Sequence, residues 1–239
     1  MTDDTKYEPA HLKEHRSVIL LRSALVGAAS ILPLPGVTEP LTGALRRGLM
    51  QHVAGLRQVD LEEAALDELL ADSPKQRRLT VFSALGGLAS LLRPRRAFRR
   101  MFVGLVVLRG IEEAGRAFQQ ATLLDHYCAV HHLGPAISIE KARRLRGVME
   151  QSVALTQREL ASEALIQIAT QIGRLILAVP TWVFSQIRRT GEPPPLPSLS
   201  GLVQTTQELL ASLSARRYLG RLTDSFDRKW SGGTVITVN

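Results

Sequence analysis

Residues 28–70, AASILPLPGVTEPLTGALRRGLMQHVAGLRQVDLEEAALDELL, contain the clearest helix signals in the chain. An Ala-rich apolar run ends in the PLPG of residues 33–36, which neither continues a helix nor fits a central strand. Thr38, followed by an acid and a proline, is a typical helix start, and leucine or valine then recurs every four residues. The pattern predicts an apolar helix over residues 11–32, a proline turn, and a second helix that packs back on the first and ends at about Arg57.

Further helices are predicted on the C-terminal side of this pair. Asp60 and Glu63 have the spacing of a capping box, which predicts a short helix as far as about Ala71. A proline after Ser73 predicts the start of another helix, which runs to Leu92.

The second half of the chain is predicted to be helical as well. From Pro94 to Gly134 no further proline intervenes, which predicts one long or kinked helix. Ser138 is the expected cap of the next helix, whose apolar residues recur at intervals of three and four. A proline-rich linker at residues 190–199 then leads to a last amphipathic helix from about Ser200 to Leu222. An alternating strand pattern appears only in the TVITV near the C-terminus.

A ten-residue repeat indicates a duplicated arrangement. SALVGAASIL at residues 23–32 and SALGGLASLL at residues 83–92 are identical at seven positions, and a bias toward small residues is the alternative explanation of the match. Two apolar helix–turn–helix hairpins are therefore predicted, at residues 17–57 and 74–118. The predicted fold class is an all-α helical bundle built from these hairpins plus long C-terminal helices. The expected domains are a helical domain over 1–189, the linker at 190–199, and a C-terminal helix and tail over 200–239.

The charge pattern points to an anionic partner. The chain has 30 Lys and Arg against 22 Asp and Glu, and only five of the 30 cations are lysines. Arginine bonds phosphates bidentately, although the genome's base composition can also favour it. Five arginines directly follow the apolar run of residues 83–92, where cations of a helix end could simply be solvated. We expect this cluster to bind an anionic membrane surface; its members are Arg93, Arg95, Arg96, Arg99 and Arg100.

The apolar helices carry small residues at four-residue spacing, which allows close helix packing in lipid or in a protein core. The residues concerned are Ser23, Gly27, Gly86, Gly87 and Ser90. A single membrane span needs about 20 mainly apolar residues. The runs are shorter than this, and the first of them contains Arg22. We therefore expect helices that pack together or lie in the membrane interface rather than cross it.

The start of the chain and its cysteine content predict a cytosolic protein. Cys128 is the single cysteine, and residues 1–16 lack the basic start and apolar core of a signal peptide. Together with the arginine cluster, this predicts a position peripheral to the inner face of the cell membrane.

The quoted stretch resembles the helical, membrane-associated domain of unknown function that occurs alone or appended to bacterial small GTPases, and more loosely the EcsC family. The resemblance covers roughly residues 15–110. It rests on an apolar helix, a Pro-Gly turn, a second helix and a short turn at residues 28–32, 33–36, 41–56 and 59–60. It implies a regulatory module. No GxxxxGK[ST] loop is present, so any nucleotide switch would belong to a GTPase partner.

Residues 125–132, DHYCAVHH, hold the densest set of groups that could bind a metal or react. On a helix Asp125, Cys128 and His132 share one face, which is compatible with three metal ligands or a Cys–His pair. The alternative is a buried cysteine with polar neighbours at a helix end. His11 and His15 lack the glutamate of HExxH and are expected on a solvated helix face. We expect no enzymatic activity, no resident metal and no cofactor.

Three functions are compatible with these features. The favoured one is a non-enzymatic, membrane-associated helical scaffold or regulatory module that acts through a protein partner. A basic nucleic-acid-binding protein is the first alternative, since the sequence pI is about 10.3. Only 11 aromatic residues are available for base stacking, which weakens that alternative. The second alternative is a soluble helical interaction or assembly subunit, which binds other proteins or a second copy of itself.

Overall fold

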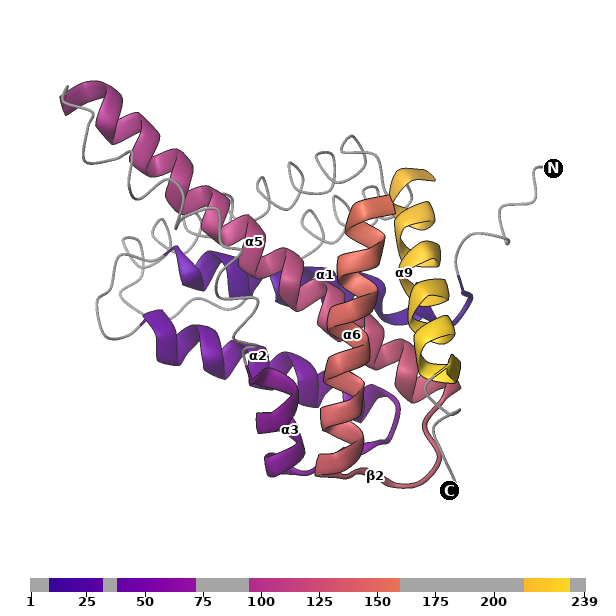
Figure 1. Ribbon diagram of the computed structural model, residues 1–239. Helices are drawn as coiled ribbons and strands as arrows, with labels where there is room; N and C mark the ends of the chain where they lie inside the picture. Colours follow the sequence, from indigo (N-terminus) through magenta and orange to yellow (C-terminus); the bar gives the residue numbers. More distant parts are fainter. Residues whose placement is uncertain (1–8, 32–37, 72–94, 160–212, 233–239) are drawn as a thin grey trace, which may run out of the picture.

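The computed structural model describes residues 9–31, 38–71, 95–159 and 213–232. Within these ranges the chain forms six helices and one pair of two-residue strands, so the all-α bundle predicted from the sequence is confirmed (Figure 1). In chain order the elements are α1 (Leu12–Ser30), α2 (Thr38–Leu56), β1 (Asp60–Leu61), α3 (Glu63–Leu70), α5 (Arg95–Val130), β2 (Ala136–Ile137), α6 (Ile139–Glu159) and α9 (Leu213–Gly232).

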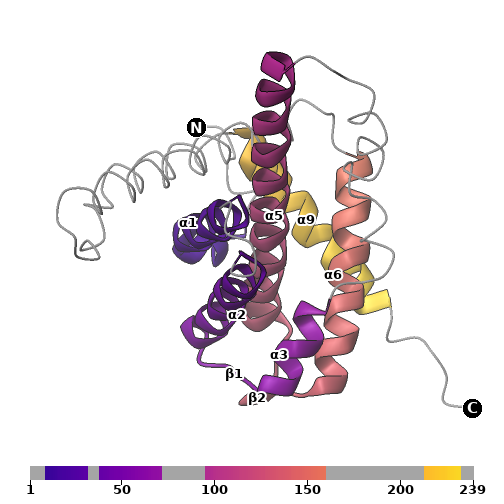
Figure 2. The same ribbon diagram turned by 90° about the vertical axis from the view of Figure 1, so that its left-hand side faces the viewer.

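Helix α5 is the central element of the bundle. It has 36 residues, which corresponds to about 54 Å of helix. Figure 2 shows α1 and α2 on one side of α5 and α6 on the other. Helix α9 packs along α6 and reaches the C-terminal part of α5, while α3 packs on α6 (Figure 1). The long helix expected between Pro94 and Gly134 is therefore confirmed, and it connects the two halves of the bundle.

Small residues permit the close packing of α1 against α5. On α5 the buried face includes Ala114, Ala117 and Ala121, each at most 1% exposed. On α1, Ser23 and Gly27 are buried, and the Ser23 hydroxyl donates to the carbonyl oxygen of Ile19 within its own helix. The structure thus places these two predicted packing residues in the bundle core, where they take part in helix packing. Their counterparts Gly86, Gly87 and Ser90 lie outside the described residues.

The connection between α2 and α3 differs from the prediction. Asp60 is not a helix cap: its N–H donates to the carbonyl oxygen of Pro135 at 2.7 Å, and β1 pairs in parallel with β2. Glu62 takes the N-cap position of α3 without a side-chain cap hydrogen bond. The capping-box interpretation was therefore wrong, because a backbone partner in the segment between α5 and β2 holds Asp60 in an extended conformation.

The ends of the later helices test the remaining local predictions. Ser138 precedes α6, and its Oγ accepts from the backbone N–H of Lys141 at an N···O distance of 3.5 Å, as expected of a helix cap. The last helix ends at Gly232 instead of Leu222. It continues because apolar side chains recur every four residues through Phe226 and Trp230, both of which pack on the bundle.

None of the helices in the described ranges is long and apolar enough to span a lipid bilayer. The predicted helix at residues 74–92, which contains the second copy of the repeat, lies outside the described residues. So do the turn of the second predicted hairpin and the linker at residues 190–199.

Candidate functional site

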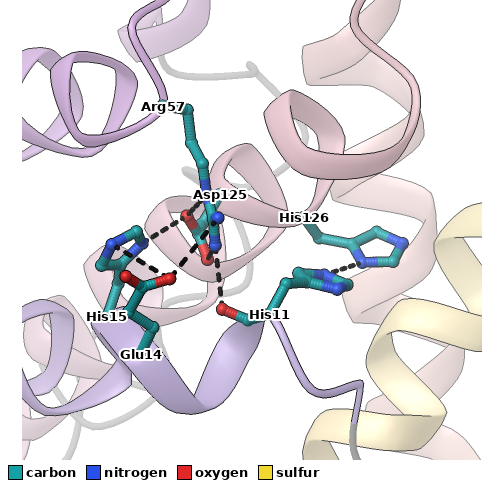
Figure 3. A network of polar contacts seen from close by, with 6 residues as sticks. All are labelled: His11, Glu14, His15, Arg57, Asp125 and His126. Atoms are coloured by element: carbon teal, nitrogen blue, oxygen red, sulfur yellow. Dashed lines mark hydrogen bonds and ion pairs between the residues drawn. The ribbon is translucent and has the colours of Figure 1, made fainter.

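Two polar clusters meet near the C-terminal end of α5, around the adjacent residues Asp125 and His126 (Figure 3). Consecutive residues on a helix point about 100° apart, so the two side chains face different neighbours. Asp125 faces α1 and the end of α2, whereas His126 faces the start of α1 and α9. Both clusters are assembled from segments that are far apart in the sequence.

Asp125 is the centre of the first cluster, and its side chain is fully buried. Arg57 donates from Nε to Oδ1 at 2.7 Å and from Nη2 to Oδ2 at 3.1 Å, and His15 Nδ1 donates to Oδ1 at 3.1 Å. Arg57 also donates to the carbonyl oxygen of His11 at 2.8 Å. The hydrogen bonds to Asp125 raise the pKa of Arg57 above its ordinary value, although burial acts in the opposite direction. This fork fastens α1, α2 and α5 together.

Asp227 of α9 is the centre of the second cluster. Its Oδ1 accepts hydrogen bonds from His126 Nε2 at 2.8 Å and from His131 Nε2 at 2.6 Å. Burial raises the pKa of Asp227, but the hydrogen bonds and the charges of His131 and His126 together outweigh it, so the pKa lies below the ordinary value. His11 Nε2 lies 2.9 Å from His126 Nδ1, and the two rings are stacked with centroids 5.1 Å apart (Figure 3).

Aromatic rings border the second cluster. Phe226 and Trp230 flank Asp227 on α9, and their rings are stacked with centroids 5.9 Å apart. His126 meets the edge of Phe226, and His131 lies near both rings. The Arg144 guanidinium lies over the Trp230 ring, 4.4 Å from its centroid. These rings shield the side of the cluster that faces α9.

The predicted set Asp125, Cys128 and His132 does not form a common site. Asp125 is occupied by Arg57 and His15, as described above. Cys128 is buried, and burial raises the pKa of its thiol to about 12, so the thiol stays protonated at neutral pH. His132 packs beside Tyr127, with ring centroids 5.7 Å apart. Each of the three side chains thus has a structural environment of its own.

The prediction for the two N-terminal histidines was wrong. His15 is buried and bonded to Asp125, and His11 is bonded to and stacked on His126. Burial and the neighbouring His126 are the main causes that lower the pKa of His11, while the charge of Asp125 acts in the opposite direction. No signal in residues 9–15 shows that α5 covers this part of the chain. The sequence alone therefore could not predict the contacts of His11 and His15.

The candidates selected from the sequence in residues 125–132 were Asp125, Cys128 and His132, and they do not include the group that the fold brings together. In the described part of the chain, the His, Cys and acidic side chains close enough to share a metal ion are His126, His131 and Asp227. The five-residue spacing of the two histidines was available as a weak signal. No sequence signal pointed to Asp227, since it lies about a hundred residues further along the chain in a segment without a motif.

The arginine cluster begins α5. Arg95, Arg96, Arg99 and Arg100 occupy its first two turns, and Arg93 lies outside the described residues. Two acids further along α5, Glu112 and Glu113, have other arginines beside them. Glu113 pairs with Arg46, and Glu112 lies 3.6 Å from Arg116.

The sequence matches no family model, and it is not significantly similar to any curated protein or solved structure.

Proposed function

We propose that this protein is a non-enzymatic helical module that attaches to an anionic membrane surface and acts there through a protein partner. The observation that carries the proposal is the position of the arginine cluster on α5. Its described members lie at the end of α5 that extends beyond the other described helices (Figures 1 and 2). A helix end that projects in this way can approach a flat surface without interference from the other described helices.

The residue order along this end of α5 suits a membrane interface. The four arginines are spaced so that 95 and 99, like 96 and 100, lie one above the other on the helix. The next eight residues, MFVGLVVL at 101–108, are apolar all round the helix and span about 12 Å. An interfacial helix buries its apolar residues about 5–10 Å below the headgroups, where arginines meet phosphates.

The partner and the location are further parts of this proposal. The likeness to a domain associated with bacterial small GTPases supports a GTPase as the protein partner, and the absence of a P-loop in this chain agrees with a switch carried by another protein. The inner face of the cell membrane supplies both anionic lipid and access to such a partner.

Flotation of the full-length protein with vesicles of phosphatidylglycerol and phosphatidylcholine tests the proposal. We expect salt-sensitive binding. Replacing Arg95, Arg96, Arg99 and Arg100 by Gln removes about 1 kcal/mol per cation, so partitioning at low salt falls roughly a thousandfold. Lys at the same four positions retains most of the binding, because the ammonium group keeps the charge.

A charge-matched control separates the cluster from net charge. Lys13, Lys141, Arg228 and Lys229 are exposed on other helices, so their replacement by Gln lowers the charge equally and should change lipid binding much less. Equal losses in the two variants contradict the assignment to α5. If the wild type binds duplex DNA with a steep salt dependence and does not bind vesicles, the nucleic-acid-binding function is favoured instead. Binding to neither favours an interaction subunit.

A further inference from the structure

We propose that His126, His131 and Asp227 bind a divalent transition-metal ion of the Zn²⁺ class. Their ligand atoms, one from each side chain, all lie within 4.8 Å of one another. Two imidazoles and one carboxylate are a common ligand set for Zn²⁺, which accepts both nitrogen and oxygen donors. The lipid-binding end of α5 proposed above takes no part in this site.

The distances require only a small adjustment to admit an ion. The Asp227 Oδ1 is 2.8 Å from His126 Nε2 and 2.6 Å from His131 Nε2, with a proton in each contact. Ligand atoms of a tetrahedral Zn²⁺ site lie about 3.3 Å apart, as follows from metal–ligand distances of about 2.0–2.1 Å. Side-chain rotations that separate the carboxylate oxygen from His126 Nε2 by about 0.5 Å and from His131 Nε2 by about 0.7 Å, and that place the two Nε2 atoms at the same spacing of about 3.3 Å, bring the cluster to this geometry.

His11 supplies an outer contact of the kind that metal-bound histidines use. An imidazole that binds an ion through Nε2 carries its proton on Nδ1 and donates it to a neighbouring acceptor. The His126 Nδ1 faces His11 Nε2 at 2.9 Å, and His11 can accept this proton because its own can reside on Nδ1. His11 is thus a positioning residue, which orients His126 and selects its tautomer.

The exposure of the three ligands leaves room for a further ligand of the ion. The side chains of His126, His131 and Asp227 are 3%, 18% and 40% exposed, so the cluster is closed on the His126 side and open on the Asp227 side. A three-ligand site open to solvent keeps at least one position for water or a small anion. Bound in this way, the ion also joins α9 to the end of α5.

The test uses the full-length protein without a polyhistidine tag, freed of metals by a chelator and titrated with Zn²⁺ in a calorimeter. We expect one saturable site per chain and a rise in melting temperature on addition of Zn²⁺. Asp227→Asn keeps the size and one acceptor oxygen of the side chain but loses the charge, and it should abolish the strong site. His11→Phe keeps a stacked ring and should weaken binding about 10- to 100-fold.

Two further measurements make the result specific. His52→Ala removes a histidine of α2 that lies outside the cluster, and it should leave the affinity unchanged. Co²⁺ should give visible d–d absorption without a thiolate-to-metal charge-transfer band, since Cys128 is not a ligand. Absence of saturable Zn²⁺ binding by the wild type overturns the proposal even if a variant fails to fold. Unchanged binding by folded Asp227→Asn, or a thiolate band with Co²⁺, also overturns it.

Discussion

At the level of single residues, Asp125 shows why a charge can occupy the core of this bundle. A carboxylate removed from water loses several kcal/mol of hydration, which must be offset by nearby charges and hydrogen bonds. The Arg57 fork and His15 supply three hydrogen bonds to the two carboxylate oxygens. Removing one partner leaves the others buried and unpaired, so the cluster is stable only when complete.

Asp125→Ala should therefore lower the free energy of unfolding by about 3–5 kcal/mol. The variant leaves Arg57 largely buried without its carboxylate. Urea denaturation followed by circular dichroism measures the change. The control is Asp67→Ala, which removes the partner of Arg47 from an exposed ion pair and should cost less than about 1 kcal/mol. Similar losses in the two variants would show that the Asp125 cluster is not the stronger contact.

At the level of elements, the end of α2 explains how Arg57 reaches Asp125. The Val59 N–H donates to the carbonyl oxygen of Ala54, and the Gln58 N–H donates to that of Gly55, each at 3.0 Å. These two bonds form a Schellman motif, whose residue after the cap adopts a left-handed conformation. Gln58 has φ of 57°, which glycine adopts at lower cost. The motif reverses the chain and directs the next residues toward β2.

Gln58→Gly should stabilise the protein by roughly 0.5–1 kcal/mol, because relief of the left-handed strain exceeds the entropy that glycine loses on folding. The matched control is Gln51→Gly, at an exposed position inside α2, where the same substitution should destabilise by about 1 kcal/mol. Both values come from urea denaturation. A destabilising effect at residue 58 would contradict the Schellman assignment.

At the level of the whole molecule, α9 packs against both α6 and the end of α5. Its buried face packs on α6 and on the end of α5, and it includes Leu222 and Phe226, which have no exposed surface. The residues that form hydrogen bonds with α9 lie 86–101 positions earlier in the chain, so these contacts form only when α5, α6 and α9 are assembled. We expect α9 to unfold together with α6 rather than before it.

Leu222→Ala should consequently destabilise the entire described bundle by about 2–5 kcal/mol, since it leaves a cavity between α9 and its neighbours. Hydrogen exchange with mass spectrometry should show the same loss of protection in α1 as in α9. Leu133→Ala is the control: this leucine is 86% exposed, and its removal should change stability negligibly. Loss of protection confined to α9 would mean that this helix is an independent unit.

The accuracy of the sequence predictions varied with the range of the interactions involved. Helix α5 was predicted from Pro94 and Gly134, because proline and glycine act on the backbone at their own positions. The cap at Ser138 was equally local. The interpretation of Asp60 was wrong because its backbone partner, Pro135, is 75 residues away. Glutamine at position 58 also hid the left-handed turn, which glycine would have signalled.

The sequence by itself determines the helix content, the order of the helices and most of their ends. These features follow from apolar spacing and from proline, glycine and capping residues, which act within a few residues along the chain. The meeting of His11 and His126, and of His126, His131 and Asp227, was decided by the packing of α1 and α9 on α5. Helix packing brings together side chains separated by about a hundred residues. Motifs and periodicity in the sequence do not indicate which distant residues come into contact. The candidate metal site was therefore found only in the folded chain.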